Sequence, residues 1–349
     1  MTFAEYNNAT LQAPDPGQIA RRLERWFARH QRPLPWRNGY DPYHVWVSEV
    51  MLQQTRMEVV LPYFERFVAR FPTLQALAGA TEQEVLAAWS GLGYYRRAKM
   101  LRAGAIEVVA RFGGTVPSTV DELLTIPGIG RYTAGAIASV AWNRHAPIVD
   151  GNVARIVSRL FAIEHSLGTP ALMNAAWQRA TELVDACKTP RAFNQGLMEV
   201  GALVCKPRNP SCLLCPVAND CVARATGRAG ELPRPKVKAE TRELSIALYL
   251  ITDRKGRVLM RRESGPLMNA MYHLPHGDTS LLTGSPLAAA RGELLGTFRH
   301  TVTTRRIEFS VYAGAVKQHP RGEYAWIDPE ALHDVPHPSY VRKALRWLP

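Results

Sequence analysis

The sequence predicts a multidomain protein in which an all-α N-terminal region is followed by a smaller α+β domain. Apolar residues recur at helical spacing through the first 225 residues, and no run there alternates as a strand would. A stretch rich in Gly, Pro, Lys and Arg follows, and beyond it the pattern becomes that of strands. The length of 349 residues accommodates two or three domains of about 150 residues each. We therefore expect domains at 1–225 and 243–349, joined by an extended linker at 226–242.

Glycine and proline separate the predicted elements from one another. In the first region helices are expected at 18–30, 45–70, 73–78, 81–89, 95–111, 118–124, 131–141, 150–161, 170–187 and 190–204. Pro62 indicates a break or a new first turn inside the second of these segments. In the second region strands are expected at 244–252, 258–261, 307–316 and 324–327, with a hairpin turn at 253–256 and helices at 287–295 and 339–347.

The charge balance points to a polyanionic partner. Lys and Arg number 43 against 30 Asp and Glu, which gives a net charge of +13. Nucleic acid is the first candidate and an acidic membrane surface the second. The chain starts without a basic segment followed by an apolar run, and no stretch reaches the ~18 apolar residues of a membrane span. We expect an intracellular protein of the cytoplasm and nucleoid, with no membrane partner.

Four of the five cysteines lie within 17 residues, spaced C-x6-C-x2-C-x5-C. They are Cys205, Cys212, Cys215 and Cys221. Disulfides are disfavoured inside cells, so the cluster indicates a metal site, either zinc or a four-iron cluster. The spacing alone does not choose between the two. Cys187 reads as a buried helix residue, and Lys206 and Arg208 within the loop would present positive charge to phosphates.

A glycine-rich turn joins two predicted helices at 124–134. Pro127 ends the first helix, and Gly128 and Gly130 permit a positive φ and the close approach of another backbone. The second helix then begins with exposed N–H groups, which suit a phosphate. The same sequence is also common in plain helix–helix turns, so both interpretations remain open at this point.

Two carboxylates stand out from their surroundings. Glu49 lies in an almost wholly apolar helical turn, where a carboxylate is costly unless it is paired or protonated. Burial raises a carboxyl pKa, which suits a general acid, but Glu49 could equally lie at the polar edge of a core helix. Asp150 follows an apolar run and begins a helical pattern, as a helix N-cap does. A capping aspartate can also present its second oxygen to a ligand, so the two interpretations of Asp150 are compatible.

Several segments, taken together and in order, carry a family resemblance. They are 34–37 (LPWR), 48–55 (SEVMLQQT), 91–95 (GLGYY), the glycine-rich turn, 149–152 (VDGN) and the four cysteines. The chain resembles the helix–hairpin–helix base-excision DNA glycosylases, and among them the MutY family of adenine DNA glycosylases. The likeness extends from about residue 18 to 225, and the weaker part at 240–349 is similar to the family's MutT-like, or Nudix-like, domain. It implies a [4Fe-4S] cluster in the loop 205–221.

The resemblance also implies roles for individual residues. Glu49 would protonate N7 of an extruded adenine, Asp150 would stabilise the cationic sugar, and Tyr132 and Asn152 would orient these groups. DNA and base contacts would come from Arg32, Trp36, Arg37, Gln54, Thr55, Leu92, Tyr94, Gly128, Gly130, Gln195 and Thr303. Among them Gln54 and Tyr94 match residues that enter the base stack, and Gln195 fits a reader of base edges.

The implied function is that of a monofunctional DNA glycosylase in base excision repair. Its substrate would be duplex DNA with adenine opposite 8-oxoguanine or guanine, and it would act as a monomer, with repair or replication proteins as further partners. The related endonuclease III family has a catalytic lysine where this chain has Tyr132, so no Schiff base can form there. The alternatives are an endonuclease III-like pyrimidine glycosylase and a non-catalytic DNA-binding iron–sulfur protein.

The C-terminal region departs from the family pattern in two places. The stretch 290–296, comparable to the metal-binding segment of Nudix pyrophosphatases, has one carboxylate, too few for a Mg²⁺ site. This domain is therefore expected to bind and not to hydrolyse. The family's Phe-Ser-His triplet for 8-oxoguanine falls on Val302, Thr303 and Thr304, and only Thr303 keeps a comparable hydroxyl. We expect a weaker preference for 8-oxoguanine over guanine as the opposing base.

Overall fold

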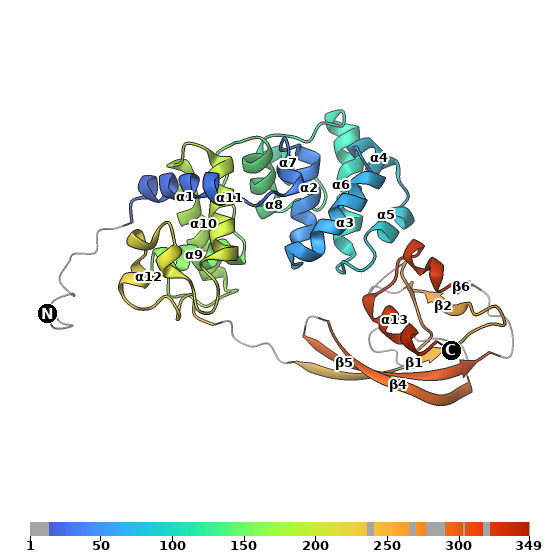
Figure 1. The fold of residues 1–349 in the computed structure, drawn as a ribbon. Helices are drawn as coiled ribbons and strands as arrows, with labels where there is room; N and C mark the ends of the chain where they lie inside the picture. Colours follow the sequence, from blue (N-terminus) through green and yellow to red (C-terminus); the bar gives the residue numbers. More distant parts are fainter. Residues whose placement is uncertain are drawn as a thin grey trace. The chain divides into compact units, whose positions relative to one another are not determined.

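The computed structural model describes residues 14–235, 241–264, 270–276, 290–302, 304–316 and 322–348. Backbone contacts divide the chain into two compact units (Figure 1). Unit 1 combines Met1–Val50 with Glu107–Lys238, and unit 2 combines Met51–Ile106 with Ala239–Pro349. The sequence pattern did not anticipate that 51–106 would group with the C-terminal residues. Within the described ranges, no helix is both long enough and apolar enough to cross a membrane.

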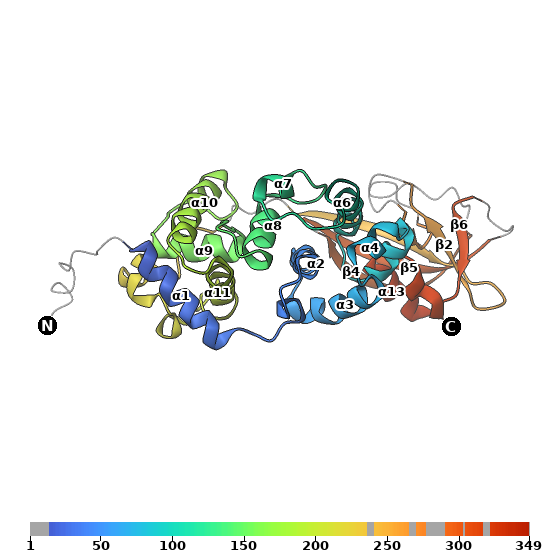
Figure 2. The same cartoon turned by 90° about the horizontal axis from the view of Figure 1, so that it is seen from above.

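Unit 1 is helical, as predicted for the first 225 residues. Its elements, or the parts of them that it contains, are α1 (Pro16–His30), η2 (Pro35–Arg37), α2 (Pro42–Leu52), α6 (Arg96–Phe112), α7 (Val120–Leu124), α8 (Arg131–Ala136), the π-helical η3 (Ile137–Ala141), α9 (Gly151–Leu160), α10 (Pro170–Asp185), α11 (Pro190–Leu203), η4 (Cys212–Leu214), η5 (Ala218–Asp220) and α12 (Val222–Ala225). Helices α1, α9, α10 and α11 pack side by side (Figure 2). Their apolar faces form a core that includes Leu23, Val157, Leu183 and Phe193.

The helices of unit 2 are α3 (Met57–Arg70), α4 (Leu74–Gly79), α5 (Glu82–Ala88) and part of α6. The prediction of a break at Pro62 is wrong, because Pro62 lies inside α3. The chain turns earlier, at residues 53–56, where Gln54 adopts a φ of +57° and Arg56 is extended. A proline in a helix removes one backbone hydrogen bond, whereas the left-handed Gln54 cannot continue a helix at all.

The β-rich part of unit 2 contains two three-stranded sheets. In one sheet β1 (Arg242–Leu250) pairs in parallel with β5 (Arg305–Ala315), which pairs antiparallel with β4 (Ala290–Val302). In the other, β2 (Val258–Arg262) lies between β3 (Tyr272–His273) and β6 (Tyr324–Ile327). Apolar side chains from both sheets share a core with α13 (Ser339–Ala344), which follows η6 (Glu330–Asp334) and precedes η7 (Leu345–Trp347). The strand predictions and the C-terminal helix are confirmed.

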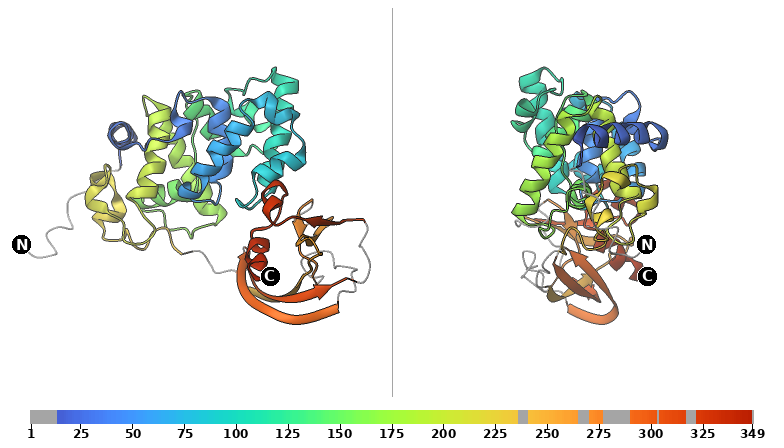
Figure 3. Two further views of the ribbon diagram at one scale, coloured as in Figure 1. Left: turned by 45° about the vertical axis from the view of Figure 1, so that its right-hand side comes forward. Right: turned by 90° about the vertical axis from the view of Figure 1, so that its left-hand side faces the viewer.

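The helix predicted at 287–295 is wrong over its described part, since residues 290–295 belong to β4. Two leucines in succession suggested a helix, but Gly292 and Gly296 weaken one. Gly296 also has a packing role, because a Cβ there would lie 2.4 Å from the Trp347 ring. Figure 3 shows β4 and β5 as long, curved strands, and register shifts interrupt their pairing between Arg291 and Gly296.

Candidate active site

Helix α2 carries Glu49 into the interior of unit 1. Val45, Trp46 and Val47 are fully buried, so this helix is covered on all sides. Glu49 is 6% exposed, and Oε2 accepts a 2.7 Å hydrogen bond from the hydroxyl of Tyr132 on α8. The carboxylate therefore lies inside the protein and not at the polar edge of a core helix.

The surroundings of Glu49 give it the protonation behaviour of a general acid. Burial raises its pKa from 4.5 to about 7, the hydrogen bond from Tyr132 opposes the rise, and the charge of Asp150 adds to it. The positive charge of Arg37 has a smaller, lowering effect. A carboxyl group that titrates near neutral pH can deliver a proton at neutral pH. The charge of Asp150 contributes to this rise, so the two predicted carboxylates interact electrostatically.

Asp150 is the N-cap of α9, as its sequence context predicted. Oδ1 accepts a 2.7 Å hydrogen bond from the backbone N–H of Val153, which satisfies a free donor of the first turn. Oδ2 accepts a 3.0 Å hydrogen bond from the side-chain amide of Asn152. The cap fixes one oxygen, so the carboxylate has a defined direction.

Arg155 fixes the orientation of Asn152, and the sequence analysis missed it. Its guanidinium donates a 2.8 Å hydrogen bond to Oδ1 of Asn152, which leaves the amide nitrogen directed at Asp150. The same guanidinium donates to the carbonyls of Gly201 (2.9 Å) and Cys205 (2.8 Å). The sequence feature that could have singled out Arg155 is its place in the apolar pattern of 153–160. An arginine is rarely buried unless its hydrogen bonds are satisfied there.

A second polar cluster brings together three of the predicted base-contact residues around Glu199. Glu199 is 1% exposed and accepts from Arg32 at 2.8 Å and from Arg37 at 2.8 Å. Arg37 also donates a 2.8 Å hydrogen bond to Oε1 of Gln195, whose amide nitrogen donates to the hydroxyl of Tyr40. Glu199 was missed, although it stands in an apolar run of α11 just as Glu49 does in α2. Trp36, on η2, is buried at 5% exposure.

The glycine-rich turn connects α7 to α8 as predicted. Gly128 adopts a φ of +82°, whereas Gly130 has a φ of −95° and caps the first turn of α8. Both glycines are exposed, and Ile126 and Ile129 are buried beneath them. The turn therefore presents backbone to the surface while its isoleucines anchor it.

In unit 2, Arg97 ties together the two loops that carry Gln54 and Tyr94. Both residues are exposed and adopt a positive φ, +57° and +49°. Arg97 donates to the carbonyls of Met51 (2.9 Å), Gln53 (2.7 Å), Leu92 (3.4 Å) and Gly93 (3.2 Å) and to the hydroxyl of Thr55 (3.2 Å). Its guanidinium lies 5.5 Å from the Tyr94 ring. Leu92, in contrast, is buried at 6% exposure.

The four clustered cysteines lie near one another in unit 1. Burial, together with the charges of the other three cysteines, raises the pKa of Cys215 to about 12. Arg159 donates a 3.2 Å hydrogen bond to the sulfur of Cys205 and a 2.8 Å one to the carbonyl of Lys206. These thiols need a positive partner to remain thiolates, and a metal ion supplies one. Cys187 is buried, as predicted.

Comparison with known proteins identifies the family. Residues 47–182 match the model of the HhH-GPD superfamily base excision DNA repair protein. The adenine DNA glycosylase of Buchnera aphidicola (Schizaphis graminum) is 31% identical over 332 residues, covering 92% of this chain and 95% of that protein. This chain belongs to the adenine DNA glycosylase family. The rat adenine DNA glycosylase is 44% identical over 231 residues, 63% of this chain.

Other comparisons agree with the fold of this adenine DNA glycosylase family member. The match to the structure of a thermostable thymine-DNA glycosylase covers 60% of this chain and 97% of that protein, with 27% identity and a TM-score of 0.53. The chain spans less than half the length of its rat relative, 45%. Thr303, predicted to contact the opposing base, lies outside the described residues.

Proposed function

We propose that this protein is a monofunctional adenine DNA glycosylase of base excision repair, which hydrolyses the N-glycosidic bond of adenine opposite 8-oxoguanine or guanine in duplex DNA. The observation that carries the proposal is Glu49, which is buried and has a pKa raised to about 7, in part by the charge of Asp150. Family membership supports the same reaction.

The reaction begins with rotation of the adenosine out of the duplex, since its glycosidic bond cannot be reached inside the stack. Glu49 donates its proton to N7 of the base, and the bond between N9 and C1′ breaks, so that neutral adenine leaves with the bonding pair. The sugar is left as an oxocarbenium ion, which the carboxylate of Asp150 stabilises. Water then adds to C1′, and its proton returns to a carboxylate. The product is an abasic site.

Two residues position these carboxylates. Tyr132 holds Glu49 through its 2.7 Å hydrogen bond, and Asn152 holds Asp150 through one of 3.0 Å. Tyr132 has no amine with which to attack C1′, so strand cleavage from this position is not expected. This favours a monofunctional enzyme over the endonuclease III-like alternative.

The test is base release by the purified full chain from duplexes with A·8-oxoguanine, A·G and A·T pairs. We expect strand breaks at adenine only after alkali treatment, because alkali cleaves the abasic site that the enzyme leaves. Glu49→Gln and Asp150→Asn should each reduce single-turnover release at least 1,000-fold while binding of duplex DNA persists. Release at the normal rate by Glu49→Gln would remove the general acid from the proposal. Strand breaks without alkali would favour the lyase alternative.

We further propose that Cys205, Cys212, Cys215 and Cys221 hold a [4Fe-4S] cluster. The donor set fits, because the four thiols lie close together and Arg159 offsets their negative charge. The choice of a cluster over a single Zn²⁺ rests on the resemblance to the adenine DNA glycosylase family, to which the chain belongs. When bound, the cluster would tie down the loop that carries Lys206 and Arg208.

Cysteine variants separate the cluster from zinc. Cys212→Ser should lose iron, sulfide and the broad visible absorption of a four-iron cluster, whereas the matched Cys187→Ser should retain them. Cys187 is the control because it is buried in unit 1 outside the cysteine loop. Zinc in place of iron in protein purified without oxygen would contradict the assignment.

We propose that the preference for 8-oxoguanine over guanine as the opposing base is weaker than the family pattern implies. Val302 lacks the stacking area of phenylalanine, and Thr304 lacks an imidazole. Comparing single-turnover rates for A·8-oxoguanine and A·G tests this. Strong discrimination that is lost in Thr303→Ala would show that the substituted loop still reads the lesion.

A further inference from the structure

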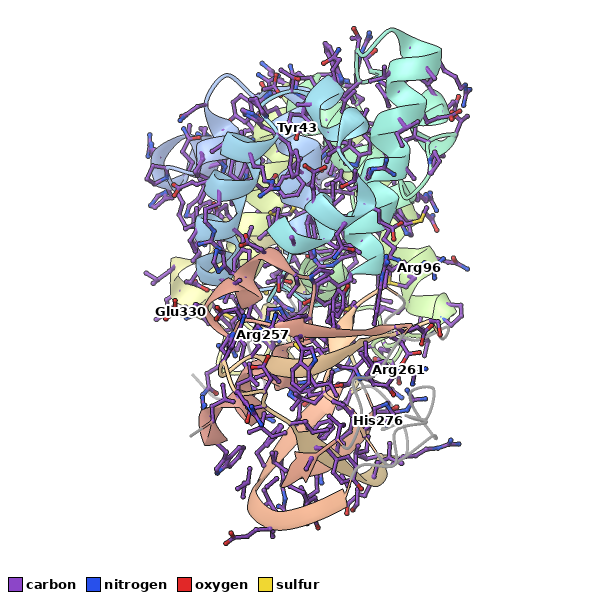
Figure 4. The ribbon with its side chains drawn as sticks, turned by 90° about the vertical axis from the view of Figure 1, so that its right-hand side faces the viewer. Tyr43, Arg96, Arg257, Arg261, His276 and Glu330 are labelled. Atoms are coloured by element: carbon purple, nitrogen blue, oxygen red, sulfur yellow. The ribbon has the colours of Figure 1, made fainter. Side chains whose placement is uncertain are left out.

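Three side chains of types that can bind a metal ion are buried together in the β-rich part of unit 2. Figure 4 labels one of them, His276, and also Arg261. Glu263, His273 and His276 are each 1% exposed or less. One ligand atom of each lies within 4.8 Å of those of the other two. The active-site argument uses none of these residues.

Backbone pairing holds the three residues in place from two segments of the chain, the end of β2 and residues 270–276. Arg261 on β2 pairs with His273 on β3, and one step further the backbone N–H of Glu263 donates to the carbonyl of Met271 at 2.8 Å. His276 is paired with Leu248 of β1, in the other sheet. The side chains are therefore brought together by both sheets, and a ligand shared by them would connect the two sheets.

The hydrogen bonds of His273 fix which of its nitrogens faces Glu263. Nδ1 lies 3.0 Å from the carbonyl of Leu274, and a carbonyl oxygen only accepts, so Nδ1 carries the proton. Nε2 lies 3.1 Å from Oε2 of Glu263. In the neutral ring this places a nitrogen lone pair against a carboxylate oxygen, an arrangement that needs a shared proton or a cation between them.

We propose that Glu263, His273 and His276 form a binding site for a divalent transition metal ion, with Zn²⁺ as the best match. Two imidazoles and a carboxylate are a donor set that Zn²⁺ takes in proteins. Bonds of about 2.0–2.2 Å in a tetrahedron place neighbouring ligand atoms about 3.3 Å apart, close to the 3.1 Å between His273 and Glu263. Metal-bound histidines usually donate their other N–H to a carbonyl, as His273 does.

The surroundings allow an ion to enter and limit repulsion by the nearby Arg261. Its guanidinium is held by Glu323 at 3.0 Å, which offsets its charge. Glu263 and Glu323 both line a surface hollow of about 460 Å³. The hollow, which Arg262 also lines, therefore gives a hydrated cation access to the carboxylate of Glu263. Three protein ligands leave the fourth position for water.

Zinc binding to the full chain tests the proposal. After dialysis against a weak chelator, titration calorimetry should detect about one equivalent of Zn²⁺ that does not displace iron. Glu263→Gln and His276→Gln should each weaken this binding by more than about 100-fold, with iron content unchanged. The matched control is His333→Gln, because His333 is an exposed histidine of η6 whose side chain is 72% exposed. Equal binding by wild type and the ligand variants would overturn the proposal.

A second measurement needs no variant and decides the matter even where a variant fails to fold. X-ray absorption at the zinc edge of the Zn²⁺-loaded wild type should show a shell of nitrogen and oxygen at about 2.0–2.1 Å, with imidazole scattering. A sulfur shell at about 2.3 Å would place the ion on the cysteine loop and overturn the assignment. Absence of stoichiometric zinc would mean that His273 and Glu263 share a proton.

Discussion

The hydroxyl of Tyr132 donates a 2.7 Å hydrogen bond to Oε2 of Glu49 and opposes the rise that burial imposes on the pKa of this carboxyl. Tyr132 comes from α8 and Glu49 from α2, so the pair depends on the packing of two helices. The bond therefore lowers the pH at which Glu49, the proposed general acid, loses its proton.

Tyr132→Phe should move the pH dependence of base release to higher pH. Without the hydrogen bond the pKa of Glu49 rises above 7, so the acid remains protonated further into the alkaline range. We expect the descending limb of the single-turnover rate to shift up by about one pH unit, the size expected for one hydrogen bond to a charged group. Tyr43→Phe, at a buried tyrosine of α2, the helix that carries Glu49, should leave the limb in place. A downward shift would contradict the geometry.

Glu49→Gln should stabilise the protein at neutral pH while it abolishes activity. The pKa of Glu49 is raised from 4.5 to about 7, so its contribution to stability is full below pH 4.5 and is lost as pH rises through 7. Glutamine has no charge to bury and can still accept from Tyr132. The free energy of unfolding of Glu49→Gln should therefore exceed that of wild type by an amount that grows between pH 5 and pH 8, to at most about 3 kcal/mol.

Melting temperatures of wild type and Glu49→Gln across this pH range provide the measurement. Glu65→Gln is the control, because it removes an exposed carboxylate from the middle of α3, away from the helix ends. A Glu49→Gln advantage that is constant from pH 5 to pH 8 would show that Glu49 is already ionised in the folded protein at pH 5, so that its pKa is not raised.

The sequence was sufficient where local pattern decides the structure. The apolar turn around Glu49 made a buried carboxylate one of its two interpretations, and the Asp-Gly-Asn sequence at Asp150 indicated a helix cap. Both follow from short-range chemistry, namely the cost of burying charge and the free N–H groups of a first turn. The alternation of apolar and polar residues in β1 and β5 likewise predicted strands.

The sequence was insufficient where partners are far apart along the chain. Arg155 reaches the carbonyl of Gly201, and Arg32 reaches Glu199, across 46 and 167 residues. A single sequence has no pattern that pairs such residues, because their meeting depends on the packing of α1, α9 and α11. The prediction of a helix at 287–295 failed for a related reason. Pairing with β5, and not the composition of the segment itself, makes β4 extended.

Gly201→Ala should impair base release without touching the substrate. A Cβ at Gly201 would lie 2.7 Å from Cβ of Asn152, closer than side chains tolerate, so Asn152 must move. Because Asn152 holds Asp150, we expect a loss of at least tenfold in the single-turnover rate. Overpacking of this kind also destabilises, by about 1–3 kcal/mol. Gly79→Ala is the matched helical control, since nothing lies within 4 Å of a Cβ there. Normal release by Gly201→Ala would show that Asn152 tolerates displacement.

Arg97 should control rotation of the adenosine out of the duplex, through the loops of Gln54 and Tyr94. Its guanidinium donates to both loops, and burial lowers its pKa to about 10, so it remains charged at neutral pH. Arg97→Met removes these donors and should release both loops from their positive φ conformations. Fluorescence of 2-aminopurine beside the target adenine, which reports unstacking, should show at least a tenfold loss of rotation.

The neighbouring Arg96 separates this positioning role from simple attraction to phosphate. Arg96 is exposed, so Arg96→Met removes the same charge without altering the loops. We expect it to weaken DNA binding modestly and in a salt-dependent way, with rotation of the bound adenosine retained. Arg97→Lys keeps the charge but has three donors on a point ammonium in place of a planar fork, so it should recover only part of the rotation. Equal loss in Arg96→Met and Arg97→Met would mean that charge, and not the fixed loops, drives the opening of the duplex.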